Sequence, residues 1–170
     1  MKGITPCLWF DDQAEDAANF YVSIFSSLGG SASGAKAQIV DAASYGKEAA
    51  QVSGKPEGMV MTVMFQLDGQ EFMALNGGPE FKFSEAISLM VSCESQEEVD
   101  ELWDRLSEGG EEGPCGWLKD KYGLSWQVVP TVLGEMLQDE DRNRAERVMK
   151  AMLQMKRIDI QVLKQAYEHG

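Results

Sequence analysis

The sequence of 170 residues contains a single histidine, His169, which is next to the last residue. Histidine is the usual base that activates a serine or cysteine nucleophile, so Ser–His and Cys–His pairs are excluded from the rest of the chain. Carboxylate pairs such as Asp11–Asp12 and Glu111–Glu112 do occur. We interpret them as solvated surface charge, because Asp and Glu are rarely buried. The composition therefore disfavours the common forms of nucleophilic catalysis.

Cysteines are few, and long apolar runs are missing. The three cysteines, Cys7, Cys93 and Cys115, are odd in number and widely spaced. This pattern disfavours a disulfide framework and indicates a reducing, cytoplasmic compartment, in which we expect each cysteine to be a small buried residue. No apolar run approaches the roughly 18 residues of a membrane span. Residues 1–4 lead directly into an expected strand, so we expect no signal peptide.

Basic residues are also few, with 15 Lys and Arg against 28 Asp and Glu and a formal net charge of −13. Residues 1–130 carry this whole excess, because residues 131–170 contain seven residues of each sign. Binding to nucleic acid depends on Lys and Arg that contact phosphates, and anionic membranes attract basic segments. We therefore expect neither nucleic acid nor a membrane as a partner.

The most informative pattern present is an internal repeat. Residues 4–28 and 86–110 each combine a short apolar run with a helical pattern, and the two segments align at an offset of 82 positions. At this offset Tyr21 aligns with Trp103 and Ile24 aligns with Leu106. Two copies of one strand–helix unit predict a pseudo-symmetric fold.

Both repeats predict a helix with one buried stripe, over about 13–26 and 96–108. A polar residue with an acid three places on, Asp12 with Glu15 and Ser95 with Glu98, predicts each helix start. Glycine pairs follow both helices and suit helix ends. They are Gly29-Gly30 and Gly109-Gly110, and the first lies in a small-residue connector over 26–34.

The remaining pattern predicts strands. We expect a strand over 36–45, a long loop over 46–58, a hairpin of 59–67 and 70–75 joined by Asp68-Gly69, and a final strand over 124–129. Each half then reads β-α-β-β-β, which predicts an α+β domain over 1–130 with modules of about 4–78 and 86–130.

Residues 131–170 have a different character and predict a helical C-terminal extension. The expected helices cover about 131–137, 142–155 and 160–168, and Asp159 is the expected N-cap of the last one. Forty residues with two amphipathic helices cannot bury their apolar faces alone. They must pack on the main domain or on a second subunit.

Three motifs follow one another along the chain: Pro6-x-Leu8-x-Phe10 leading to Phe20-Tyr21, Asn76-Gly77-Gly78-Pro79, and Gly123-x-x-Trp126-Gln127. With the repeat, they make residues 4–130 resemble the PhnB-like (3-demethylubiquinone-9 3-methyltransferase-like) family. This family is part of the glyoxalase/bleomycin-resistance/dioxygenase, or vicinal oxygen chelate, superfamily. The resemblance implies paired βαβββ modules, each a curved sheet around a cavity, and commonly a homodimer; the helical tail resembles an extension of some members.

The resemblance also implies positions for a divalent metal, which superfamily enzymes hold with His or Glu on the first and last strands of the modules. Those positions fall at Pro6, Ser88 and Gln127, with a fourth at about Ala74. Proline and alanine side chains offer no donor atom, and serine and glutamine are weak neutral ligands. We therefore expect no metal and no other cofactor. S-adenosylmethionine-dependent methyltransferases usually have a Gly-rich turn after the first strand, whereas this chain has Asp11-Asp12-Gln13 there. The sequence therefore gives no support for methyltransferase activity.

We expect a cavity that binds a small organic molecule through apolar and neutral polar groups. The residues expected to line it are Pro6, Leu8, Phe10, Asn76, Ser88, Trp117, Ser125 and Gln127, with Phe81, Phe83 and Trp117 at the rim beside Asn76. The leading hypothesis is a metal-free, cytoplasmic, homodimeric small-molecule-binding protein. The other interpretation of the aromatic residues is that they fill the core. One alternative is a metal-dependent lyase, isomerase or dioxygenase with carboxylate ligands, and another is an interaction module that assembles through the tail.

Overall fold

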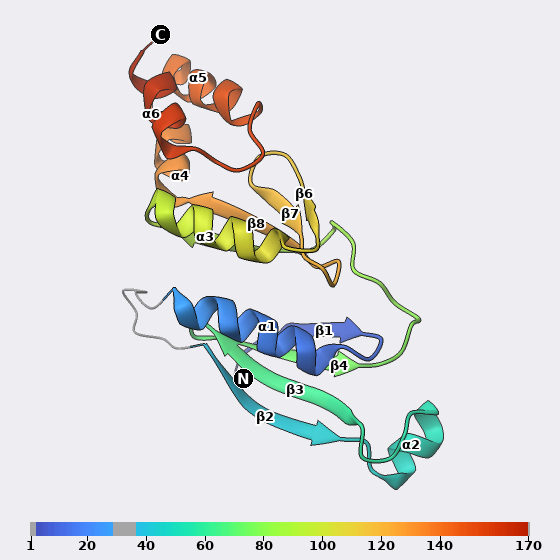
Figure 1. The fold of residues 1–170 in the computed structure, drawn as a ribbon. Coiled ribbons are helices and arrows are strands. Elements are labelled where there is room, and N and C mark those ends of the chain that lie inside the picture. Colours follow the sequence, from blue (N-terminus) through green and yellow to red (C-terminus); the bar gives the residue numbers. More distant parts are fainter. Residues whose placement is uncertain (1–2, 29–36, 170) are drawn as a thin grey trace. The chain divides into compact units, whose positions relative to one another are not determined.

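The computed structural model describes residues 3–28 and 37–169, and the chain forms two compact units, residues 1–82 and 83–170. Each unit contains a four-stranded sheet. In both sheets the order from one edge to the other is the unit's first, last, third and second strand in sequence (Figure 1). The sequence predictions of an α+β fold with two repeated βαβββ modules and of a helical C-terminal end are confirmed. No described helix is long and apolar enough to cross a bilayer.

The first unit contains, in chain order, β1 (Cys7–Phe10), α1 (Ala14–Ser27), β2 (Gln38–Ser44), α2 (Lys47–Ser53), β3 (Val60–Leu67) and β4 (Gln70–Asn76). The strand order is β1-β4-β3-β2, with β1 parallel to β4 and the other neighbours antiparallel. The prediction of a loop over 46–58 is wrong for α2, whose Lys-Glu-Ala-Ala start consists of good helix formers. The Gly29-Gly30 pair and most of the 26–34 connector lie outside the described residues.

The hairpin of β3 and β4 follows the Asp68-Gly69 signal. Both residues have positive φ, 44° for Asp68 and 84° for Gly69. A two-residue turn of this kind matches the right-handed twist of the flanking strands. The turn fixes the register, in which Leu67 pairs with Gln70 and Thr62 pairs with Leu75.

The core of the first unit lies between its sheet and α1. The Tyr21 ring lies 6.1 Å from that of Phe65, and Phe65 stacks on Phe72 at 5.4 Å. Ala14, Ala17 and Ala18 are fully buried, so α1 approaches the sheet closely. The alternating buried positions of β3 and β4 therefore face α1.

The start of α1 differs from the sequence prediction. Gln13, and not Asp12, is the N-cap residue, and its side chain makes no capping hydrogen bond. The Ala14 amide instead donates to Oδ1 of Asn76 at 2.8 Å, 62 positions along the chain. The capping-box prediction for Asp12 and Glu15 is wrong because a strand residue supplies the acceptor.

The second unit contains β5 (Ser88–Cys93), α3 (Gln96–Ser107), β6 (Glu111–Glu112), β7 (Trp117–Lys119) and β8 (Ser125–Pro130), followed by the tail. The strand order is β5-β8-β7-β6, and β5 is parallel to β8. The N-cap prediction for α3 is confirmed, because Ser95 Oγ accepts from the Glu98 amide at 3.2 Å. The predicted stripe is buried in full, at Val99, Leu102, Trp103 and Leu106.

The tail, here residues 131–169, forms α4 (Thr131–Leu137), α5 (Arg142–Met152) and α6 (Ile160–Glu168). These helices share one apolar cluster with the end of β8. Its buried members are Leu133, Met136, Val148, Ile158 and Leu163, with Val129 of β8 packed against them. The Asp159 N-cap prediction is confirmed by a 2.9 Å hydrogen bond from the Val162 amide.

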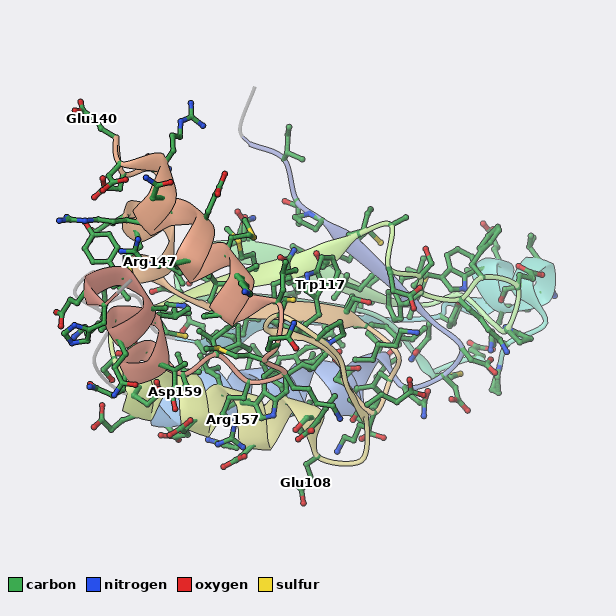
Figure 2. All side chains as sticks on the ribbon, turned by 90° about the horizontal axis from the view of Figure 1, so that it is seen from above. Glu108, Trp117, Glu140, Arg147, Arg157 and Asp159 are labelled. Atoms are coloured by element: carbon green, nitrogen blue, oxygen red, sulfur yellow. The ribbon has the colours of Figure 1, made fainter. Side chains whose placement is uncertain are left out.

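The tail is anchored to the rest of the second unit by polar contacts. Gln96 of α3 donates to the Ile158 carbonyl at 3.1 Å and accepts from the Ile160 amide at 2.8 Å. Arg157 lies in the segment before α6 and forms ion pairs with Asp100 and Asp104 of α3. Its side chain projects towards α3 (Figure 2). Of the two alternatives left by the sequence, the tail packs on its own main domain.

Candidate functional site

One face of the second sheet carries several of the polar and aromatic residues singled out by the sequence. On β7 and β8, the side chains of Leu118, Trp126 and Val128 are at most 2% exposed, and these strands contact α3. Because side chains alternate along a strand, the residues between them lie on the opposite side. We call this opposite side the open face and define it by Ser88, Met90, Trp117, Lys119, Ser125 and Gln127.

The register arranges the open face in two rows across the strands. Ser88, Ser125, Lys119 and Glu111 are successive partners on β5, β8, β7 and β6. In the next row, Gln127 pairs with Trp117. Gln127 Nε2 also donates to Ser88 Oγ at 2.8 Å and so links the rows. The arrangement joins an indole ring to several hydrogen-bonding groups.

A hollow of about 380 Å³ lies at the β6 side of the open face. Trp117, Lys119 and Ser125 line it, together with the two glutamates of β6, the following Gly113-Pro114 turn, and Glu85. This volume is in the range of small-molecule sites. A larger depression over α5 is formed only by side chains of that one helix, among them Arg147 (Figure 2).

Ser125 is the most unusual group in the hollow. It is 1% exposed, and its Oγ has no hydrogen-bond partner within the part of the chain that the structure describes. A buried hydroxyl left without a partner costs about 1–3 kcal/mol. Such a group is explained when a bound molecule or an ordered water completes its hydrogen bonding.

Lys119 and Glu85 form an ion pair at the edge of the hollow, with Nζ 2.5 Å from Oε1. The hydrogen bond from Lys119 is the main cause of the lowered pKa of Glu85. The same bond, aided by the charges of Glu85 and Glu111, raises the pKa of Lys119. Both side chains are partly exposed, so the pair fixes the position of charge more than it stabilises the fold.

The structure brings together the predicted residues of the second module. Trp117 and Ser125 line the hollow, and Ser88 and Gln127 lie beside it on the open face. Sequence reasoning missed Lys119, although strand alternation from Trp117 would have placed both on one face. It also missed Glu85, for which the sequence carries no signal, because this residue comes from the segment before β5.

The predicted residues of the first module have a different role. Leu8 and Phe10 are 5% and 4% exposed and pair with Ala74 and Asn76 on the face that α1 covers. Pro6 shares their alternation and uses its carbonyl to accept from the Met73 amide. For Leu8 and Phe10, core packing replaces the expectation that their side chains line a cavity, whereas Pro6 is half-buried.

Both polar groups of the Asn76 side chain form structural hydrogen bonds. Its Oδ1 accepts from Ala14, its Nδ2 donates to the Val60 carbonyl at 2.9 Å, and its carbonyl accepts from the Tyr45 hydroxyl at 2.6 Å. The bond to Ala14 fixes the start of α1 on the sheet. The side chain is only 2% exposed, so it is not accessible to a ligand. Phe81 packs edge-to-face on Trp9 within the first unit and does not line the hollow.

Comparison with known proteins supports the fold and identifies the family. Residues 2–129 match the family model described as 3-demethylubiquinone-9 3-methyltransferase. A PhnB protein from Bacillus cereus with the same description is 34% identical, with a TM-score of 0.62 over 76% of this chain and 100% of that one. The chain belongs to this PhnB-like family. No curated protein shows significant similarity to it.

Two more distant structures share the fold of this PhnB-like protein. PA1353 from Pseudomonas aeruginosa is 20% identical, with a TM-score of 0.56 over 76% of this chain and 98% of that one. The fosfomycin resistance protein FosX from Listeria monocytogenes, solved as a complex with Mn(II) and sulfate, is 18% identical. Its TM-score is 0.52 over 81% of this chain and 99% of that one. At these identities the likenesses show a shared fold alone.

The residues at the superfamily's metal positions do not fit a metal in this PhnB-like protein. Pro6 and Ala74 have no side-chain donor, and Gln127 and Ser88 are hydrogen-bonded to each other. Within residues 3–28 and 37–169, no three His, Cys, Asp or Glu side chains lie close enough to hold a metal. The donor set suits a ligand held by hydrogen bonds.

The cysteines follow the prediction only in part. Cys93 is buried, and burial, with the charges of Glu98 and Glu94, raises its pKa to about 12, so its thiol stays protonated. Cys115 is half-buried. Cys7 is exposed, so the expectation of burial is wrong at this position: it lies on the face of β1 opposite Leu8 and Phe10, which α1 does not cover.

Proposed function

We propose that this PhnB-like protein binds a small organic molecule in the hollow on the open face of the second sheet. The single observation that carries the proposal is Ser125, a residue that lines a hollow of about 380 Å³ and whose buried hydroxyl has no partner among the described residues. A ligand oxygen or nitrogen within hydrogen-bond distance would complete its bonding. The binding relies on side-chain hydrogen bonds and aromatic contact, without a metal.

Trp117 supports this proposal from the same wall. Its indole is only half-buried, so a flat apolar group can pack against it, and aromatic side chains contribute much of the contact energy in ligand sites. The hydrogen bond between Gln127 and Ser88 holds two further polar groups in fixed positions next to it. The proposed ligand therefore combines a flat apolar part with at least one hydrogen-bonding group.

The test is an NMR titration of the ¹⁵N-labelled full chain with benzyl alcohol, which carries a ring and one hydroxyl. We expect saturable shifts at the Trp117 indole N–H and at the Ser125 amide. Ser125→Ala should weaken binding by about 5-fold, the value of one hydrogen bond of about 1 kcal/mol. Ser92→Ala changes an exposed serine of the same sheet and is the control. Shifts absent from Trp117 and Ser125, or binding that Ser125→Ala leaves unchanged, would overturn the proposal.

We also propose that the protein is a homodimer, located in the reducing cytoplasm that its three widely spaced cysteines indicate. The family resemblance supports a dimer, and the edge strand β2 supports it independently. All seven residues of β2 are exposed, including Ile39 and Val40, and natural proteins usually protect such an edge. Light scattering on the purified chain tests the proposal: a monomeric mass at tens of micromolar would contradict it.

A further inference from the structure

We infer that the hollow on the open face selects an organic cation, a molecule with a protonated amine joined to a flat apolar group. The inference rests on the proposed function, because it assigns a ligand class to the same hollow. Three features carry it: the charges that line the hollow, the position of the Trp117 ring, and the unpartnered Ser125 hydroxyl.

The ionisable side chains of the lining are three glutamates and one lysine, Glu85, Glu111, Glu112 and Lys119. Lys119 is already neutralised by Glu85 at 2.5 Å. Glu112 accepts from Trp103 Nε1 at 3.1 Å, with Lys156 3.6 Å away. Glu111 is exposed and forms no salt bridge among the described residues, although its charge contributes to the raised pKa of Lys119. The lining therefore presents an excess of negative charge.

Glu111 and Trp117 are placed to contact one ligand. Glu111 pairs with Lys119, and Trp117 is two residues before Lys119 on the same strand. This makes Glu111 and Trp117 diagonal neighbours on one face, roughly 7–8 Å apart, close enough for one amine to reach both. An ammonium group between them gains an ion pair and a cation–π contact.

Ser125 fits the same ligand. A protonated amine is a donor with several N–H groups, and a serine Oγ accepts through its lone pairs. Anions fit the hollow poorly, because its one lysine already has a carboxylate partner and the remaining glutamate charge repels them. Neutral molecules gain the ring contact and a hydrogen bond but no ion pair.

The experiment compares three probes of similar size and different charge: benzylammonium, benzyl alcohol and benzoate. Each is titrated into the ¹⁵N-labelled full chain at pH 7 and low salt, with the Trp117 indole N–H as the readout. We expect benzylammonium to bind about 5-fold more tightly than benzyl alcohol, the combined value of an exposed ion pair and a cation–π contact. Benzoate should bind most weakly.

Variants connect the preference to named charges. In Glu111→Gln the ratio of benzylammonium to benzyl alcohol affinity should fall to about 2-fold, because the ion pair is lost. Glu108→Gln removes the same charge at an exposed position outside the hollow and should leave the ratio unchanged. Lys119→Gln removes the competing cation and should raise the ratio. Unchanged amide spectra away from the site verify that each variant is folded.

The outcomes separate this inference from the proposed function. If benzyl alcohol binds and benzylammonium has no advantage, or benzoate binds as tightly, the cation selectivity is overturned and the small-molecule site stands. The same holds if Glu111→Gln and Glu108→Gln change the ratio equally, since the effect is then one of net charge. If no probe shifts Trp117, both proposals fail together.

Discussion

The turn between β7 and β8 depends on one buried carboxylate, Asp120, which is 3% exposed. Its Oδ1 accepts from the amides of Tyr122 and Leu124 at 2.8 and 3.1 Å. Its Oδ2 accepts from the Trp126 indole Nε1 at 2.8 Å. We predict that Asp120→Asn destabilises the second unit strongly, because the amide cannot replace a carboxylate that accepts on both oxygens.

The magnitude follows from these three bonds. A hydrogen bond to a charged group contributes about 1.5–3 kcal/mol, and a buried donor left unpaired costs a similar amount. With its oxygen towards the two backbone amides, the Asn side chain points its NH₂ group at Trp126 Nε1–H, donor against donor. The bond to Trp126 is then lost outright and the other two are weakened, for an expected cost of about 2–4 kcal/mol.

The assay is urea unfolding followed by circular dichroism, with hydrogen exchange of the Tyr122 and Leu124 amides to localise the effect in the second unit. Trp126→Phe removes the donor that opposes the amide. In a double-mutant cycle, Asp120→Asn and Trp126→Phe should therefore couple by about 1–2 kcal/mol. Asp41→Asn, an exposed position in β2, is the control. A cost below about 0.5 kcal/mol, or a coupling near zero, would refute the reasoning, since surface changes fall in that range.

Three further predictions concern other contacts. Gly77→Ala should destabilise the first unit by about 1–3 kcal/mol, because a Cβ at Gly77 would lie 2.2 Å from the Trp9 ring; thermal unfolding and the shift of the Trp9 indole N–H measure this, and an unmoved indole would contradict it. Asn76→Ala should lower the free energy of unfolding in urea by about 2–3 kcal/mol, because it leaves the Ala14 amide and the Val60 carbonyl unpaired. A loss as small as that of a surface substitution would contradict the structural role of these two hydrogen bonds. In a ¹³C carboxyl titration Glu85 should titrate below the ordinary glutamate pKa. Its ion pair with Lys119 therefore contributes to folding stability above the unfolded-state pKa, and this contribution is lost as pH falls through the lowered pKa of the folded state. Lys119→Gln should return the pKa of Glu85 to the ordinary value.

Features encoded by neighbouring residues could be predicted from the sequence. Asp68-Gly69 specifies the β3–β4 turn because both positions need positive φ, which Gly and Asp tolerate. Ser95 with Glu98 marks the start of α3 because the cap bond spans three residues. The repeat at an offset of 82 correctly indicates two modules, since each copy forms a sheet of the same order.

Features that depend on distant residues could not be predicted in this way. The α1 cap comes from Asn76, so the local Asp12 signal competes with a long-range partner that the spacing cannot show. The tail is held by Gln96 and Arg157, whose partners lie more than 50 positions away. Periodicity finds the apolar faces of such helices and leaves open which surface covers them.

The candidate site shows the same division. Alternation puts Ser125 and Gln127 on one face, and the structure has them there. What makes Ser125 informative is the lack of a partner for its hydroxyl in the described part of the chain, and no sequence pattern encodes this. The Glu85–Lys119 pair likewise depends on the path of the segment before β5.

The two modules share a topology but differ in chemistry at equivalent strands, which explains why the site lies on the second sheet. β4 and β8 occupy the same place in the strand order of their sheets. On the side of β4 away from α1 the residues are Met73 and Leu75, with the exposed Glu71 beside the turn, whereas on the side of β8 away from α3 they are Ser125, Gln127 and Val129. A metal site shared equally by both repeats would need donor atoms on both strands. The apolar centre of β4 and the neutral polar groups of β8 favour a ligand that is held by the second module through hydrogen bonds.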